Sequence, residues 1–157
     1  MKYALNDHDL VARFVASLIP HVRARGFGNC RAIGICTDKD ELVAGLIYHA
    51  LDPEAGLIEI SGAALPGYQW ATRETLKIMH GFPFGQCGCQ MVVMKVRWSD
   101  ERLLRQLAAL GYEFIKVPRL FGRGQDGVLC CLTEEEWRAN RITRRLLRSH
   151  KQEQEAA

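Results

Sequence analysis

The sequence lacks the features that would assign it to several special classes of protein. No apolar run is long enough to cross a bilayer. The acidic residues Asp7 and Asp9 follow the start too closely for a secretory signal peptide. No internal repeat or low-complexity linker interrupts the chain. We therefore expect a cytoplasmic protein without a membrane partner, built as a single domain over residues 1–150 with a flexible polar tail over residues 151–157.

The cysteines lack the spacing of a zinc site. Of the six, Cys87 and Cys89 are separated by one residue and Cys130 and Cys131 by none, whereas zinc knuckles typically use a gap of two. No pair of histidines at ligand spacing accompanies them. We therefore expect no metal, and reduced thiols packed as small apolar residues in strands. The remaining two cysteines are Cys30 and Cys36.

The net charge of +3 is too small to indicate a nucleic-acid binding protein by itself. Basic residues nevertheless cluster near the C-terminus, at Arg138, Arg141, Arg144, Arg145, Arg148 and Lys151. On a helical projection four of them share one face: Arg138, Arg141, Arg145 and Arg148. Together with Trp137, Arg119 and Arg123, this face favours a nucleic-acid binding module as an alternative function. An ordinary solvated helix explains the pattern equally well.

Hydrophobic residues make up 48% of the chain, enough to bury a core, and their periodicity predicts its elements. Helices are predicted over residues 7–25, 70–80 and 100–110 and after Thr133; strands are predicted over residues 31–37, 41–50, 56–64, 89–96, 112–121 and 128–132. Pro20 is expected to bend the first helix. Short polar links between the first three strands predict an antiparallel meander.

Two of these segments resemble those of a known family. Residues 100–112 form a helix with an Asp100 cap and a Gly111-Tyr112 end that leads directly into a strand. Residues 57–64 form an apolar strand that ends in small residues. With the order of elements over residues 31–132, they resemble the GNAT (Gcn5-related N-acetyltransferase) family, in the small versions found in phages and prophages. The resemblance implies an α/β (α+β) fold with a mixed, mostly antiparallel central sheet flanked by helices.

The resemblance also implies that acetyl-CoA is the co-substrate. Backbone groups near Gly62, Ala63 and Ala64 would lie against the pantetheine arm and polarise the acetyl carbonyl. The amides at the start of the next helix would hold the pyrophosphate. The residues implied around that helix start are Gln69, Trp70, Ala71, Thr72 and Arg73, and Asp100 stands where the family has Asn.

The segment before this helix departs from the family's pattern, Arg/Gln-x-x-Gly-x-Gly/Ala. Thr72 and Glu74 stand where the family has small residues that let the backbone approach phosphate. Arg73 and the Thr72 hydroxyl would offset the loss. An ordinary helix cap at Thr72 and a solvated Arg73 are alternatives of equal weight.

Acetyl transfer to an amine requires a base, and an acid for the leaving thiolate. Glu59 resembles the family's strand carboxylate and is expected to act as the base through a water. Strict alternation between Ile58 and Ile60 leaves open that Glu59 faces solvent. The tyrosine that the family commonly uses as thiolate acid falls on Leu107, so this acid is missing; Tyr48, Tyr68 and His80 are the substitutes.

The function that the resemblance implies is transfer of an acetyl group from acetyl-CoA to an amine of an unknown acceptor. The alternative is a degenerate GNAT scaffold without catalysis. Such a scaffold would bind nucleic acid or another protein, or would form a homodimer.

Overall fold

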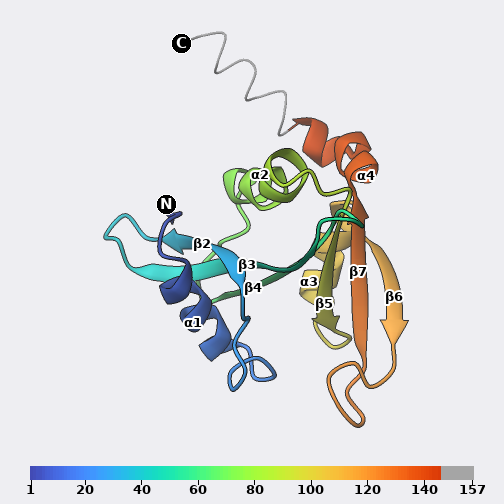
Figure 1. Ribbon diagram of the computed structural model, residues 1–157, viewed down its shortest axis with the longest axis horizontal. Coiled ribbons are helices and arrows are strands. Elements are labelled where there is room, and N and C mark those ends of the chain that lie inside the picture. Colours follow the sequence, from blue (N-terminus) through green and yellow to red (C-terminus); the bar gives the residue numbers. More distant parts are fainter. Residues whose placement is uncertain (146–157) are drawn as a thin grey trace. The chain divides into compact units, whose positions relative to one another are not determined.

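The computed structural model describes residues 1–145, and these fall into two compact units (Figure 1). The first unit is Met1–Thr72, and the second begins at Arg73. Over the described residues, no helix is both long and apolar enough to span a membrane. The tail predicted over residues 151–157 lies outside the described residues.

The first unit is an antiparallel meander covered by one helix. Its strands are β1 (Lys2–Ala4), β2 (Cys30–Cys36), β3 (Leu42–Asp52) and β4 (Leu57–Ala64), and each pairs antiparallel with the next. The predicted meander is therefore confirmed, and the sequence missed only the three-residue β1. In the β3–β4 hairpin, Gly45 pairs with Ala63 and His49 pairs with Glu59.

The helix of this unit, α1 (His8–Leu18), lies against β2 and β3 (Figure 1). It begins after Asp7, because an Asp7 carboxylate oxygen caps it by accepting a hydrogen bond from the Leu10 amide at 3.3 Å. It ends at Leu18, since Ile19 is extended and Pro20 disfavours helix in the residue before it. The prediction of a helix to Arg25, bent at Pro20, is therefore wrong.

The contact between α1 and the sheet depends on glycine. Val11 and Val15 are 1% and 0% exposed and pack against Ala32 and Ile47. A Cβ on Gly45 would lie 2.6 Å from a methyl group of Val15 and 2.8 Å from one of Val11. The absence of a side chain at this position therefore sets how closely α1 approaches β3.

The substitution Gly45→Ala is expected to lower the free energy of unfolding by about 1–3 kcal/mol, because the added methyl overpacks a closed contact. Urea denaturation followed by circular dichroism measures the change. Gly81→Ala is the control, since a Cβ there meets nothing within 4 Å and the backbone is already helical. Equal effects of the two substitutions would contradict the packing argument.

Within the described residues, the second unit contains three strands, three helices with one π-helical turn, and a further helical segment over residues 141–145. The elements are α2 (Arg73–Gly81), η1 (Phe82–Gln86), β5 (Met91–Arg97), α3 (Glu101–Ala109), β6 (Glu113–Val117), β7 (Gly127–Thr133) and α4 (Glu134–Ala139). Both β5 and β6 pair antiparallel with β7. The Asp100 cap of α3 is confirmed, and so is its stop, since Gly111 has a φ of 94° that side chains disfavour.

Several boundaries in the second unit differ from the prediction. Helix α2 begins three residues later than Trp70, and β6 ends at Val117, because Arg119 has a positive φ. Strand β5 begins at Met91, so Cys87 and Cys89 lie outside the strands, contrary to the prediction. The other four cysteines lie in β2 and β7 as expected.

A buried aromatic cluster holds the second unit together around His80, which is 0% exposed. Its Nδ1 donates a hydrogen bond to the Leu76 carbonyl at 3.0 Å, so its Nε2 accepts one from the Tyr112 hydroxyl at 2.8 Å. The indole of Trp137 stacks on the imidazole at 4.2 Å between centroids. Burial lowers the pKa of His80 to about 4, so the ring is neutral at physiological pH.

The basic C-terminal segment is not one continuous helix. Helix α4 ends at Ala139, because Asn140 is extended with a ψ of 137°, and residues 141–145 are helical again. The Asn140 side chain accepts a hydrogen bond from the Ile142 amide at 2.9 Å and donates one to the Ala109 carbonyl at 3.1 Å. Arg138 therefore lies on a different helical segment from Arg141 and Arg145, and the predicted shared face is wrong. Arg148 and Lys151 lie outside the described residues.

Candidate functional site

The face of the first-unit sheet that α1 covers carries three polar side chains. Ile47 on β3 and Ala63 on β4 both pack into the core beneath α1. Side chains two residues apart on a strand point to the same face. His49 therefore shares the face of Ile47, and Ser61 and Glu59 share the face of Ala63, so the three meet where the paired strands leave the core.

The geometry of these residues is that of a half-buried acid–imidazole pair. A Glu59 carboxylate oxygen lies 3.9 Å from His49 Nε2, and the two side chains are 17% and 11% exposed. The same nitrogen shares a hydrogen bond of 2.9 Å with the Ser61 hydroxyl. The ring of Phe27 lies 5.1 Å from the imidazole, between centroids. Glu59 is thus sheltered from solvent, which removes the alternative of a solvent-facing strand residue.

Glu59 and Ser61 both approach Nε2 of His49. In a Ser–His–acid relay the acid would instead bind the other ring nitrogen, Nδ1, and leave Nε2 to the serine. The arrangement therefore does not match a serine nucleophile. It suits a carboxylate that takes up a proton, with a histidine beside it.

The sequence reasoning missed His49 and Ser61. His49 follows an apolar run and has no motif of its own, so only its partner across the hairpin marks it. The link over residues 53–56 pairs Asp52 with Leu57, which by itself would place Ala50 opposite Glu59; a β-bulge between His49 and Asp52 shifts the register and brings His49 opposite Glu59, so the sequence pattern did not mark this pair.

The end of β4 was predicted to offer backbone groups to acetyl-CoA. The Leu65 amide donates to the Val43 carbonyl at 2.8 Å, which makes these two residues a hydrogen-bonded pair of the ladder. Alternation along an antiparallel ladder then points the Ala63 amide toward β3, and the amides of Gly62 and Ala64 away from it. The Ala63 amide is therefore directed to β3, and the amides of Gly62 and Ala64 point away from β3.

The segment predicted to hold the pyrophosphate precedes α2. Gln69 is exposed, Trp70, Ala71 and Thr72 are half-buried, and the Thr72 amide donates to the Trp70 carbonyl at 2.8 Å. Arg73 is exposed in the first turn of α2, next to the acidic Glu74. The exposed guanidinium suits a phosphate, while Glu74 opposes one.

Asp100 and the candidate thiolate acids differ in what they can contact. Asp100 caps α3, because its carboxylate accepts a hydrogen bond from the Leu103 amide at 3.1 Å. Position 107 supplies no acid, because it holds a leucine, whose side chain is buried. Of the three substitutes, Tyr48 and His80 are buried, and Tyr68 alone is exposed, at 42%.

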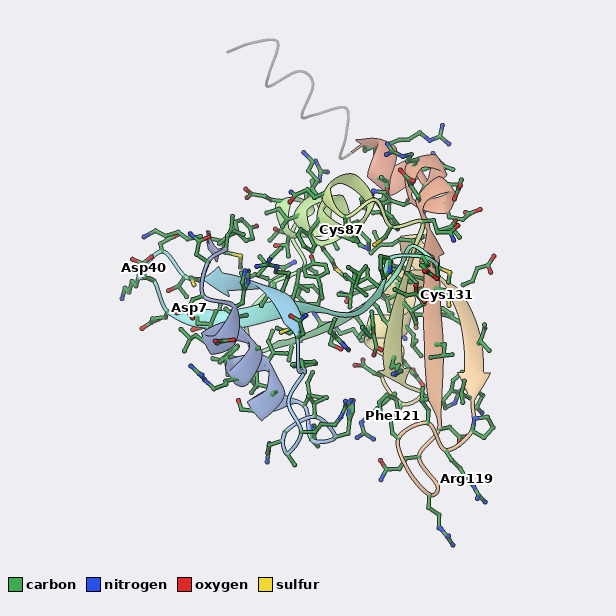
Figure 2. All side chains as sticks on the ribbon, viewed as in Figure 1. Asp7, Asp40, Cys87, Arg119, Phe121 and Cys131 are labelled. Atoms are coloured by element: carbon green, nitrogen blue, oxygen red, sulfur yellow. The ribbon has the colours of Figure 1, made fainter. Side chains whose placement is uncertain are left out.

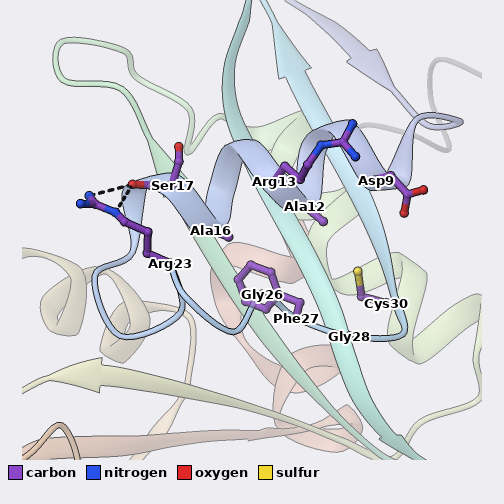
Figure 3. A pocket seen from close by; sticks show the side chains of 10 residues that line it. All are labelled: Asp9, Ala12, Arg13, Ala16, Ser17, Arg23, Gly26, Phe27, Gly28 and Cys30. Carbon is purple, nitrogen blue, oxygen red and sulfur yellow. Dashed lines mark hydrogen bonds between the residues drawn. The ribbon is translucent and has the colours of Figure 1, made fainter.

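A groove lies beside α1 in the first unit (Figure 3). Its volume is about 290 Å³, and its walls are α1 and the segment over residues 26–30. Phe27 forms part of the groove and also contacts His49, so the groove adjoins the Glu59–His49 pair. Sequence reasoning predicted no pocket here.

Within residues 1–145, no group of three or more His, Cys, Asp or Glu side chains could hold a metal ion. Burial raises the pKa of the Cys130 thiol to about 12, and it also raises the pKa values of Cys30, Cys89 and Cys131. Their thiols are therefore protonated at neutral pH, which suits neither metal binding nor nucleophilic attack.

Three of the residues behind the nucleic-acid alternative, Trp137, Arg138 and Arg144, are engaged within the chain. Trp137 is 5% exposed and stacked on His80, so it cannot stack on a base. Arg138 pairs with Glu134 at 2.6 Å, and Arg144 donates to the Ala139 carbonyl at 2.7 Å. Arg119 projects from the β6–β7 loop (Figure 2).

Comparisons with known proteins agree on the fold. No protein-family model matches the chain, and no curated protein matches its sequence. A solved structure of a protein classed as an acetyltransferase matches with a TM-score of 0.67 and 22% identity, over 82% of this chain and 71% of its own. A second protein classed as an acetyltransferase, from T. thermophilus, matches with a TM-score of 0.63 and 23% identity, over 78% of this chain and 67% of its own.

A third match is the spermidine/spermine N-acetyltransferase SpeG from Vibrio cholerae, in a mutant form. Its TM-score is 0.63 at 13% identity, over 70% of both chains. At these identities the matches show the fold and nothing finer. The chain has the fold of the GNAT acetyltransferases, and the predicted class, α/β (α+β) with mostly antiparallel strands and flanking helices, is confirmed.

Proposed function

We propose that the chain is an N-acetyltransferase, which moves the acetyl group of acetyl-CoA to the amine of an acceptor. The observation that carries the proposal is the sheltered Glu59 carboxylate beside His49, in a fold that solved acetyltransferases share. A carboxylate in a half-buried site of this kind is suited to general base catalysis.

In the proposed reaction Glu59 takes the proton that the amine loses as its nitrogen bonds the acetyl carbon, directly or through one water. Acetyl-CoA supplies the thioester, whose C–S bond breaks to leave the N-acetylated product and, once the sulfur is protonated, CoA. Tyr68, whose side chain is exposed, is the candidate donor of the proton that the sulfur takes up. His49 acts as a positioning residue, because its hydrogen bond to Ser61 and its contact with Phe27 fix it beside Glu59.

The residues proposed to bind acetyl-CoA fit it in part. In the first unit, the amides of Gly62 and Ala64 are directed away from β3 and would receive the acetyl carbonyl and the pantetheine arm. In the second unit, the first turn of α2 would bind the pyrophosphate through its amides and Arg73. Asp100 carries a carboxylate and therefore suits an N–H group of the pantetheine arm rather than a phosphate.

Arg73→Ala is expected to weaken binding of acetyl-CoA by about tenfold or more, because one charge-assisted hydrogen bond to phosphate is lost. Calorimetric titration measures the dissociation constant. Arg105→Ala removes the same charge from an exposed position on α3 that pairs with Glu101, and should leave binding unchanged. A similar loss in both variants would indicate a general charge effect instead of a phosphate contact.

Acetylation of an amine panel tests the proposal as a whole. The purified chain is incubated with acetyl-CoA and one amine at a time, and mass spectrometry detects the acetylated product. Amine-dependent transfer supports the enzyme. If no amine is acetylated while the chain retains a nucleic acid or a protein, the non-catalytic alternative is favoured; the loss of small residues at Thr72 and Glu74 is the observation behind it.

The solved neighbours suggest an acceptor and an assembly to examine first. SpeG is a spermidine/spermine N-acetyltransferase, so polyamines belong in the panel. A spermidine N-acetyltransferase from Vibrio cholerae is dodecameric, and we include a homo-oligomer, at its smallest a homodimer, in the proposal. Light scattering on the purified protein measures the molar mass and so tests for a homo-oligomer. The cytoplasmic location, the single domain over residues 1–150 and the phage or prophage origin stay predictions.

A further inference from the structure

The groove beside α1 carries more positive than negative charge. Two arginines, Arg13 and Arg23, and one aspartate, Asp9, line it. The Arg23 guanidinium donates two hydrogen bonds to the Ser17 carbonyl, at 3.1 and 2.9 Å (Figure 3). The guanidinium of Arg13 makes no hydrogen bond or ion pair with any other residue in the described range 1–145, although Asp9 lies one helical turn before it. Arg13 is therefore available to a ligand.

The same groove borders, at Phe27, the histidine that lies beside the proposed base. Phe27 lines it and contacts His49, and His49 lies 3.9 Å from Glu59. An acceptor whose amine reaches Glu59 would pass the Phe27 ring and place its other end in the groove. The volume of about 290 Å³ suits a small molecule rather than a folded protein.

Building on the proposed acetyltransferase function, we propose that the acceptor is a small amine with an anionic group several bonds from its nitrogen, and that Arg13 binds this group. A carboxylate and a phosphate share the required chemistry, because both accept paired hydrogen bonds from a guanidinium. A polycationic amine would place a second positive charge beside two arginines, which disfavours it.

Four acceptors of similar length test the proposal, with acetyl-CoA as donor. They are 6-aminohexanoate, 4-aminobutyl phosphate, hexylamine and 1,6-diaminohexane. We expect kcat/KM for the better of the two anionic acceptors to exceed that for hexylamine by about tenfold or more, mainly through KM, and the diamine to be the poorest. The better of the two identifies the anionic group. Equal values for the four acceptors would overturn the proposal.

Variants locate the effect. Arg13→Ala is expected to remove the advantage of the anionic acceptor over hexylamine; Arg13 is exposed on α1, so the variant should fold. Arg25→Ala removes the same charge from an exposed position outside the groove and should keep the advantage. Asp9→Asn should keep or increase it. Loss of the advantage in Asp9→Asn, or its survival in Arg13→Ala, would contradict the assignment.

A binding measurement separates this proposal from the proposed function. If the chain acetylates none of the four amines, the acetyltransferase proposal fails, and calorimetric titration with 6-aminohexanoate and 4-aminobutyl phosphate tests the groove alone. Binding of either compound to the wild-type chain, weakened about tenfold in Arg13→Ala, supports the groove as an anion site. No binding, or equal binding to both proteins, overturns it.

Discussion

Glu59→Gln is expected to lower kcat for amine acetylation by about 10²–10⁴-fold, because glutamine keeps the shape of the side chain and cannot take up a proton. Glu59 lies on β4, is 17% exposed and is 3.9 Å from His49 on β3. Because glutamine has nearly the same size, the substitution should change little else. Steady-state assays over a range of both substrates measure the effect. The KM for acetyl-CoA should be unchanged, since the proposed role of Glu59 is toward the amine.

Glu54→Gln is the matched control for this prediction. Glu54 lies in the exposed turn between β3 and β4, five residues before Glu59, and the same chemical change there should leave kcat at the wild-type value. If Glu59→Gln is as active as Glu54→Gln, then Glu59 is not the base. His49→Gln distinguishes positioning from catalysis, because loss of a positioning residue should lower kcat less than loss of Glu59 while the fold is kept.

The free energy of unfolding is expected to fall by about 3 kcal/mol between pH 6.5 and pH 4 because of His80 alone. Burial lowers the pKa of His80 to about 4 in the folded chain, whereas an unfolded histidine titrates near 6.5. The unfolded state therefore binds the proton first as the pH falls. The stability that the neutral ring provides is fully present above pH 6.5 and is lost progressively as the pH falls toward 4.

Urea denaturation at a series of pH values, on the wild type and on His80→Gln, isolates this contribution. Glutamine does not titrate and can still accept a hydrogen bond from Tyr112, so the variant should lose less stability on acidification. Equal pH dependence in wild type and His80→Gln would mean that His80 does not govern acid stability.

Features fixed by local chemistry could be predicted from the sequence. The carboxylate cap at Asp100 and the stop at Gly111 define α3 correctly, because a cap bond and a positive φ involve only neighbouring residues. The antiparallel topology of the β3–β4 hairpin was equally predictable, since its polar link is short; its register was not, because a β-bulge shifts it between His49 and Asp52. These elements are among those on which the family resemblance depends, and the solved structures confirm the fold that this resemblance implies.

Features that depend on tertiary contacts could not be read in this way. The break at Asn140 is stabilised by a hydrogen bond to the Ala109 carbonyl, which lies 31 residues earlier in the chain. Trp137 was counted among the residues of a nucleic-acid binding module, yet it packs on His80 and is 5% exposed. To predict His49 as a site residue one would need the strand register, and to predict the groove one would need the packing of Phe27 against α1. Neither is a local property of the sequence.

Calorimetric titration of the wild-type chain with acetyl-CoA at moderate salt tests whether the chain is an acetyltransferase. We expect saturable binding of one molecule per chain, weakened by Arg73→Ala and unchanged by Glu59→Gln. An absence of binding at millimolar acetyl-CoA would contradict it, and the fold would then serve a function other than acetyl transfer.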